Sequence, residues 1–394
     1  MNVNITLHKD VADILERLEH AGFEAYAVGG YVRDALLGKE AGDCDITTNA
    51  LPEQTKRVFE NERTVDTGIK HGTVTLIYNG VPYEITTYRV DGDYADNRHP
   101  DSVSFTATLR EDLARRDFTV NAMAYSEARG LVDAFGGRED LQSGIIRAVG
   151  NPGRRFSEDA LRILRALRFA SVLDFEIENS TRLAVFEEKH RLLSVSVERV
   201  LVELRKLVGG KGAHRVLSEY GEIICEQLRG VQKIILPKKS AFDSMAPDER
   251  LISIFYLSAN EPASAFEASI RALHGDRATE RFGGAVLRAM TQDLSGDALY
   301  ELILDTGVEV VTAALSLMES LTGEFKDKAR LEELILSGRP CKISELKIGG
   351  RDITALGVVG ERVGEILRSA VIAVMRGEIK NDIDELLAYI KKAK

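Results

Sequence analysis

Two aspartates separated by one residue, Asp43 and Asp45, are the side chains in this sequence best suited to bind a metal. Side chains alternate sides along a strand, so both aspartates are expected on one face, with Cys44 and Ile46 pointing into the sheet. Two carboxylates this close repel each other, and a divalent cation would neutralise them. The pattern therefore predicts a magnesium site, with a solvated turn as the simpler alternative.

A third carboxylate, Glu84, belongs to a predicted β-hairpin. The runs 73–78 and 83–88 alternate or are apolar, and they flank Asn79-Gly80, which is typical of a tight hairpin turn. A carboxylate within a strand is ordinarily a solvent-facing residue. Beside the aspartate pair it is a candidate third ligand, and three carboxylates suit a two-metal site.

Upstream, Gly29-Gly30 separates an apolar run ending at Val28 from a short predicted helix that Gly38 closes. A strand, a glycine-rich turn and a helix N-terminus offer backbone N–H groups to phosphate oxygens. The turn is therefore a candidate triphosphate site, and an ordinary strand-to-helix turn is the alternative.

Two later segments carry further candidates. Residues 91–100 are polar, contain glycine and proline and lack apolar periodicity, which predicts a mobile loop. Asp96 and Arg98 lie within it. Ordered structure is expected to resume at 115–125, where Arg116 is a candidate for binding a triphosphate.

From Ser157 the pattern becomes helical, with one apolar face. The opposite face is expected to carry four charged residues, Asp159, Arg162, Arg165 and Arg168. Asp159 and Arg162 lie one turn apart and offer an acceptor beside a donor. Cytosine and adenine each present an amino donor beside a ring acceptor, whereas guanine and uracil present the reverse order. The pair is thus suited to selecting C and A, and an intrahelical ion pair is the alternative.

The length, composition and net charge of the chain exclude several classes of protein. At 394 residues with 44% hydrophobic side chains, the chain is long enough for two to four domains. Its formal net charge of −10 argues against indiscriminate coating of nucleic acid, although Lys and Arg cluster between Arg147 and Arg215. The sequence shows neither a signal-peptide pattern nor an apolar run of membrane-spanning length. Its three cysteines are widely spaced, which favours a reducing cytoplasm.

Together these motifs resemble the class II tRNA nucleotidyltransferases, the CCA-adding enzymes and their relatives the bacterial poly(A) polymerases. The resemblance rests on four motifs in the family's order, at residues 29–34, 42–47, 115–124 and 158–162. The helical remainder resembles the family only loosely, and no chemistry-bearing cluster is evident after Arg215.

The resemblance implies an α+β fold with four domains. A mixed-sheet nucleotidyltransferase head over 1–145 would be followed by an all-α neck over 146–208 that recognises the base. A helical body over 209–325 and a helical tail over 326–394 that binds tRNA would complete the chain. Nothing in the sequence indicates the oligomeric state.

The resemblance also implies an activity, the addition of C, C and A from CTP and ATP to the 3′ end of tRNA without a nucleic-acid template. Asp43 and Asp45 match the carboxylates that bind Mg²⁺, and Glu84 matches the third catalytic carboxylate. The positions that match nucleotide-binding residues are Gly30, Arg33, Arg116, Asp159, Arg162, Arg165 and Arg168.

Four alternatives compete with this activity. An enzyme that adds only CC characteristically lacks the 91–100 loop, and a poly(A) polymerase usually carries a basic tail, here reduced to Lys391, Lys392 and Lys394. A non-catalytic tRNA-binding protein is expected to have lost a carboxylate. Addition of the terminal A alone stays open, because it needs the same loop and the same helix.

The loop generates the first prediction. One pocket must first prefer C and then A, so a mobile segment carrying Asp96 and Arg98 is expected to bias the pocket between two states. Deleting residues 91–98 should spare C incorporation and severely weaken addition of the terminal A, read as product lengths with CTP and ATP supplied separately. Wild-type addition of A by the deletion variant would show that the loop is a passive connector.

Overall fold

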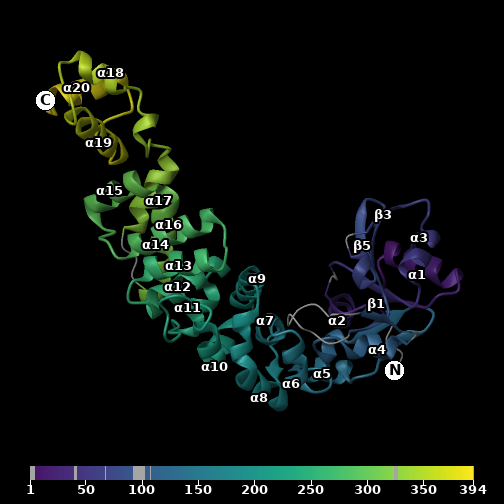
Figure 1. Cartoon of the computed structure of the whole chain (residues 1–394). Coiled ribbons are helices and arrows are strands. Elements are labelled where there is room, and N and C mark those ends of the chain that lie inside the picture. Colours follow the sequence, from purple (N-terminus) through teal and green to yellow (C-terminus); the bar gives the residue numbers. More distant parts are fainter. Residues whose placement is uncertain are drawn as a thin grey trace. The chain divides into compact units, whose positions relative to one another are not determined.

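The computed structural model describes residues 5–39, 42–66, 68–91, 103–106, 108–323 and 327–393. The chain divides into two compact units, Met1–Val216 and Leu217–Lys394, and the division falls within helix α10. The first unit contains a mixed sheet with helices, and the described part of the second is helical (Figure 1). The expected α+β class with an N-terminal sheet is confirmed, while the finer division into four domains stays a prediction.

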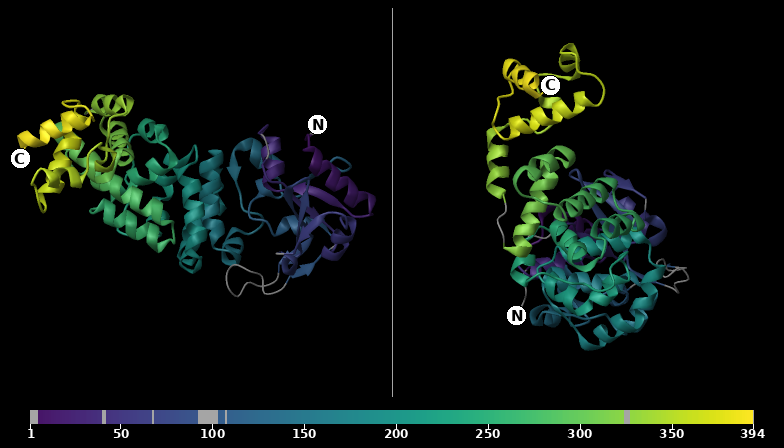
Figure 2. Two further views of the ribbon diagram at one scale, coloured as in Figure 1. Left: turned by 90° about the horizontal axis from the view of Figure 1, so that it is seen from above. Right: turned by 90° about the vertical axis from the view of Figure 1, so that its left-hand side faces the viewer.

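The first unit contains a seven-stranded sheet, in the order β3-β4-β5-β2-β1-β8-β9. Its strands belong to the purple-to-blue part of the ribbon (Figure 2). Its pairs are antiparallel except β2 with β5, which run parallel. The strands of the sheet are β1 (Ala25–Val28), β2 (Asp45–Thr48), β3 (Arg63–Val65), β4 (Thr73–Tyr78), β5 (Val81–Thr87), β8 (Met123–Ser126) and β9 (Gly130–Asp133). Two short ribbons pair β6 (Arg89–Asp91) with β7 (Val103–Phe105) and β10 (Ile145–Ile146) with β11 (Glu176–Ile177).

The helices of the first unit cover this sheet and continue beyond it. They are α1 (Lys9–His20), α2 (Gly30–Leu36), α3 (Pro52–Val58), α4 (Leu109–Ala114), α5 (Gly137–Ser143), α6 (Pro152–Glu158), α7 (Leu161–Leu173), α8 (Asn179–Glu188), α9 (Val197–Val208) and α10 (Ala213–Cys225). Short 3₁₀ helices are η1 (Ile69–His71), η2 (Thr119–Asn121) and η3 (Lys189–Ser194).

Local sequence accounts for most elements around the site. Helix α1 buries Val11, Ile14, Leu15 and Leu18, the apolar face that its spacing predicts. The β4–β5 hairpin turns at Asn79 and Gly80 with φ of 51° and 83°, as the residue pair predicts. Strand β2 begins at Asp45, so Asp43 lies two residues before the strand rather than within it.

The expected continuous helix from Ser157 is wrong at Asp159. Helix α6 ends at Glu158, and Asp159 has extended backbone angles, φ −142° and ψ 102°, before α7 begins at Leu161. The Asp159 carboxylate accepts a hydrogen bond from the Leu161 N–H at 3.1 Å. A side chain that satisfies this donor stabilises a break between two helices, and apolar periodicity carries no signal for it.

The second unit consists of packed helices in its described residues. They are α11 (Lys239–Ser244), α12 (Pro247–Ser258), α13 (Pro262–Ala272), α14 (Arg277–Met290), α15 (Gly296–Thr306), α16 (Val308–Thr322), α17 (Lys328–Ser337), η4 (Ile343–Glu345), α18 (Gly350–Ala355), α19 (Arg362–Met375) and α20 (Ile383–Ala393). Within the described chain, none of the helices combines the length and the apolar character needed to cross a membrane.

A close approach of α7 to the end of α9 gives the second prediction. A Cβ at Gly210 would overlap Ser171 of α7, whose hydroxyl donates to the Leu207 carbonyl at 2.5 Å. Gly210→Ala should destabilise the chain by about 1–3 kcal/mol through overpacking. Gly153→Ala is the matched control, because a Cβ there meets Asn151 Oδ1 at an ordinary 3.5 Å, and it should be neutral or stabilise by about 0.5 kcal/mol. Urea unfolding followed by circular dichroism measures both, and equal midpoints would contradict the packing argument.

Candidate active site

The three carboxylates meet where β2 lies between β1 and β5. In the parallel β2–β5 pair, Asp45 is the register partner of Glu84. On the other side of β2, Asp45 is opposite Val28, the last residue of β1, and Gly29 follows directly. The sheet topology thus brings the carboxylates and the glycine turn together at one edge of the sheet, where β1 ends and β2 begins.

Negative charge accumulates at this edge. Burial and then the Asp43 charge raise the pKa of Asp45, which Arg116 partly offsets. Burial followed by the charges of Asp45 and Asp43 raises the pKa of Glu84. None of the side chains in the described ranges forms a hydrogen bond or ion pair with these three carboxylates.

This set of oxygen donors fits a divalent cation. In the described ranges, however, the structure does not arrange three His, Cys, Asp or Glu side chains as a complete metal site. The candidate ligands are therefore the neighbouring Asp43 and Asp45, with Glu84 beside them. Hard cations that keep several waters need only one or two protein carboxylates.

Arg116 lies against the glycine turn. Gly29 has φ 74° and ψ −129°, and a Cβ there would come within 3.1 Å of Arg116 Nη1. A side chain at this position would be strained and would displace the guanidinium. The Nε of Arg116 is buried, and no hydrogen-bond partner for it occurs among the described residues. Arg116 therefore retains a donor beside the turn and the carboxylates.

Arg33, in α2, is oriented by two partners. Its Nε and Nη2 donate to Asp34 at 2.9 and 2.8 Å, and its Nη1 donates to Asn121 Oδ1 at 2.7 Å. Its guanidinium also lies 5.2 Å from the centre of the Phe169 ring, in α7. Arg33 thus connects the glycine turn to the helix that follows the head.

Asp159 and Arg162 do not pair with each other. The second oxygen of Asp159 accepts from Arg199 Nη2 at 2.8 Å, 40 residues away. Arg162 donates to Glu158 at 2.8 Å and to the carbonyls of Arg155 and Arg115 at 3.2 and 3.1 Å. The alternative of an ion pair between the two is therefore wrong.

The arginines of this segment do not simply face water, as charged residues opposite an apolar helix face ordinarily do. Arg162 is only 9% exposed. Arg165 donates to Asp117 at 2.5 and 2.8 Å, and Arg168 pairs with Glu203 at 2.8 Å. Burial by itself would raise the pKa of Asp117, but the Arg165 guanidinium lowers it to about 2. These arginines fix α7 to the residues after α4 and to α9.

Phe169 lies among three of these guanidinium groups. Arg168 is 4.0 Å and Arg165 is 5.4 Å from its ring centre, in addition to Arg33 at 5.2 Å. Its ring also meets Phe118 edge-on at 5.7 Å. The negative face of an aromatic ring stabilises nearby cations, so this ring helps hold like charges together.

Several residues of this arrangement were not singled out from the sequence. Asp117 and Asn121 lie inside the motif at 115–124, whose pattern does not identify their individual partners. Arg199 and Glu203 lie on the amphipathic helix α9, where charged side chains are ordinarily solvated. Asp96 and Arg98 lie outside the described residues.

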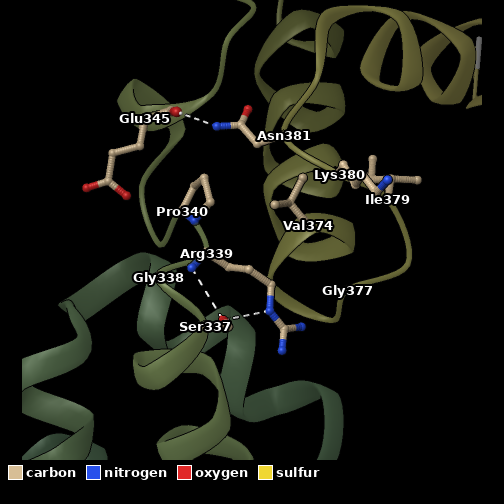
Figure 3. A pocket seen from close by; sticks show the side chains of 10 residues that line it. All are labelled: Ser337, Gly338, Arg339, Pro340, Glu345, Val374, Gly377, Ile379, Lys380 and Asn381. Atoms are coloured by element: carbon tan, nitrogen blue, oxygen red, sulfur yellow. Dashed lines mark hydrogen bonds between the residues drawn. The ribbon is translucent and has the colours of Figure 1, made fainter.

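A separate cavity of about 570 Å³ lies in the second unit, between residues 337–340 and the C-terminal end of α19 (Figure 3). Arg339 Nη1 donates to the Met375 carbonyl at 2.7 Å, so its charge is already held by the protein. Glu345 and Lys380 give the lining mixed charge. None of the predicted site residues lines this cavity.

Known proteins match nearly the whole chain. Residues 25–147 match the family model described as the poly A polymerase head domain, and residues 174–221 match a probable RNA and SrmB-binding site of polymerase A. The CCA-adding enzyme of Enterococcus faecalis is 35% identical over 398 residues, covering 98% of this chain and 96% of the relative. That of Geobacillus stearothermophilus is also 35% identical, with 97% and 96% covered.

Solved structures agree with these relatives. The Bacillus stearothermophilus CCA-adding enzyme in complex with CTP matches with a TM-score of 0.76 and 31% identity, covering 98% of this chain and 97% of that one. The Thermotoga maritima CCA-adding enzyme complexed with tRNA has the same fold, with a TM-score of 0.66 at 19% identity.

The crowded carboxylates give the third prediction. Because their pKa values are raised in the folded state, the ionised forms oppose folding near neutral pH, and this opposition falls as the pH drops through the raised values. Asp45→Asn should therefore raise the melting temperature of the metal-free protein. Mg²⁺ should raise the melting temperature of the wild type and have little effect on this variant. The surface variant Glu53→Gln is the control and should keep the full Mg²⁺ response. If Mg²⁺ raises the melting temperature of Asp45→Asn as much as that of the wild type, Asp45 is not a ligand of the metal.

Proposed function

Because the chain belongs to the family of CCA-adding enzymes, we propose that it adds C, C and A from CTP and ATP to the 3′ end of tRNA without a nucleic-acid template. The observation that carries this proposal is the register of β2 with β5. It brings Asp45 beside Glu84 at the sheet edge that also carries Asp43 and the Gly29-Gly30 turn. Binding of tRNA alone does not require three neighbouring carboxylates without ion-pair partners in the described residues, whereas metal-dependent catalysis does.

The family uses divalent metal ions, and we propose Mg²⁺ as the ion in this chain, held by Asp43 and Asp45 with Glu84 beside them. Bound Mg²⁺ would lower the pKa of the primer hydroxyl and neutralise charge on the triphosphate. Ionised carboxylates are needed for this role, so their raised pKa values predict that activity falls as the pH is lowered.

Arg33 and Arg116 are proposed to bind the triphosphate from opposite ends of the glycine turn. The Cβ-free backbone at Gly29 lets the Arg116 guanidinium approach closely, since a Cβ there would lie 3.1 Å from Arg116 Nη1. The Arg33 guanidinium lies at ordinary contact distance from Gly30. Guanidinium groups hold phosphate oxygens through several fixed donors. Positive charge beside the metal ligands would then fix the triphosphate next to the primer end.

Asp159 and Arg162 are proposed to recognise the incoming base. Arg162 has five N–H donors, of which the contacts to Glu158, Arg155 and Arg115 occupy only some. The Asp159 carboxylate accepts from the Leu161 N–H and from Arg199, and it has lone pairs left over. Their fixed side chains would offer an acceptor to the amino group of C or A, and a donor to the adjacent ring nitrogen. Arg165 and Arg168 would support this helix through Asp117 and Glu203.

The whole-length relatives favour CCA addition over poly(A) synthesis. The match to a poly A polymerase model covers only residues 25–147, whereas the match to a CCA-adding enzyme covers 98% of the chain. With tRNA as its substrate, we place the enzyme in the cytoplasm.

The test uses tRNA transcripts ending before CCA, after C and after CC, each incubated with one nucleoside triphosphate and Mg²⁺. Extension of all three, with C added before A, is the expected result. Extension of the CC-ended tRNA alone would assign the chain to A addition, and unlimited A tracts would assign it to poly(A) synthesis. Asp43→Ala, the matched inactive variant, should extend none while still binding tRNA.

Base recognition gives the fourth prediction. Asp159→Ala removes the acceptor for the amino group, so discrimination against UTP and GTP should fall by roughly five- to a hundredfold, as expected for loss of about 1–3 kcal/mol. Misincorporation is read from product lengths with UTP or GTP as the only nucleotide. Glu187→Gln on α8 serves as the control and should leave discrimination unchanged, whereas wild-type discrimination in Asp159→Ala would assign base selection elsewhere.

A further inference from the structure

Asp112, near the end of α4, is a buried carboxylate for which the proposed function has no role. Its side chain is 0% exposed, and it is surrounded by groups of the active site. Arg115 donates to its Oδ1 through Nε at 3.0 Å and Nη2 at 2.8 Å. Arg116 contacts its other oxygen, Oδ2, through Nη2 at 3.5 Å.

Two further donors tie the same carboxylate to the sheet. The Thr47 hydroxyl, in the strand that begins at Asp45, donates to Oδ2 at 3.2 Å. The backbone N–H of Arg89, at the start of β6, donates to Oδ1 at 3.4 Å. Asp112 thus joins the end of α4 to the strand that carries the candidate metal ligand.

The end of α4 also touches the proposed base-recognition residues. The Arg115 carbonyl accepts from Arg162 Nη2 at 3.1 Å. Arg115 and Arg116 are adjacent in the chain, so one carboxylate holds the segment that contacts both the proposed triphosphate site and the proposed base site. A shift of this segment would therefore move the contacts at the triphosphate site and at the base site relative to Asp45.

A buried carboxylate that receives this many donors is immobilised, and it immobilises its partners. An arginine side chain has several rotatable bonds, and Nη1 of Arg116 lies against Gly29, 3.1 Å from where a Cβ would be. Without the Asp112 charge, mutual repulsion between Arg115 and Arg116 and attraction to Asp45 would both act on this guanidinium. The arginine proposed to bind phosphate would then turn toward the metal ligands.

We propose that Asp112 is the positioning residue of Arg116, holding its guanidinium beside the Gly29 turn in the orientation that receives the nucleotide triphosphate. This inference rests on the proposed function, because it assumes that Arg116 binds the triphosphate. Asp112 touches neither substrate nor metal and acts through Arg116.

The test is a double-mutant cycle with Asp112→Asn and Arg116→Met, measured as KM and kcat for CTP on a tRNA ending before CCA. Asp112→Asn keeps the shape and removes the charge, and it should raise KM for CTP at least tenfold while kcat changes less than threefold. In the Arg116→Met background the same substitution should change KM less than twofold. Equal effects in both backgrounds would overturn the inference, because Asp112 would then act independently of Arg116.

A second readout is nucleotide binding without turnover. Wild-type protein should bind CTP more tightly than CMP, and Asp112→Asn should reduce this preference at least fivefold. An unchanged preference for CTP would contradict a role in triphosphate binding, even if KM rises.

Asp140→Asn is the matched control for loss of a buried carboxylate in the same unit. Asp140 is 6% exposed and accepts from Arg147 and from the Thr119 hydroxyl, at 3.0 and 2.6 Å. It should lower the melting temperature and leave KM for CTP within twofold of the wild type. A rise in KM for CTP equal to that of Asp112→Asn would show that both substitutions act by loosening the fold in general, and the inference would fail.

Thr47→Val covers the case in which Asp112→Asn does not fold. It removes one donor to Asp112 and keeps a β-branched side chain in the strand, so it should raise KM for CTP about threefold in the wild-type background and not with Arg116→Met. An unchanged KM, or a rise that persists with Arg116→Met, would overturn the inference. If the wild type extends no tRNA, the proposed function itself is wrong. If the wild type extends tRNA normally and Arg116→Met leaves KM for CTP unchanged, only the roles of Arg116 and Asp112 are rejected.

Discussion

The site depends on one electrostatic constraint, the crowding of carboxylates at the edge where β2 runs parallel to β5. Register pairing makes Asp45 and Glu84 neighbours, and Asp43 adds a third negative charge. The described protein offers these oxygens no ion-pair partner, so their charge is available to a divalent cation. Arg116 is the arginine whose charge acts on Asp45.

Five arginines around the site are each paired with a different carboxylate. The pairs are Arg33 with Asp34, Arg116 with Asp112, Arg162 with Glu158, Arg165 with Asp117, and Arg168 with Glu203. A buried ion pair adds little net stability, because desolvation offsets most of the attraction. It does fix orientation, and fixed donors are what recognition of a triphosphate and a base requires. The pairs are therefore better explained by positioning than by stability.

The same pairs attach α7 to the rest of its unit. Asp117 holds Arg165 from the segment after α4, and Glu203 holds Arg168 from α9. Asp159, in the break before α7, is held by Arg199 of α9. The helix proposed to recognise the base thus takes its position from both sides.

The sequence by itself determined the local elements, because each depends on neighbours within a few residues. The apolar spacing of α1, the Asn79-Gly80 hairpin and the strand before Gly29 were all predictable. The parallel pairing of β2 with β5, which brings Asp45 beside Glu84, joins residues far apart in the sequence. Family resemblance supplied the expected roles of the site residues.

Only the tertiary structure decided where the charged side chains of 159–168 would go. Helical periodicity placed them together opposite the apolar face, whereas the fold buries Arg162 and breaks the helix at Asp159. Their partners lie far away in sequence, 48 residues for Arg165 with Asp117 and 40 residues for Arg199 with Asp159. A periodic pattern predicts which residues share a helix face, but it does not predict which distant charged residue will pack against that face. That choice is made when the sheet and helices pack, because a buried charge is tolerated only where the fold brings a counter-charge to it.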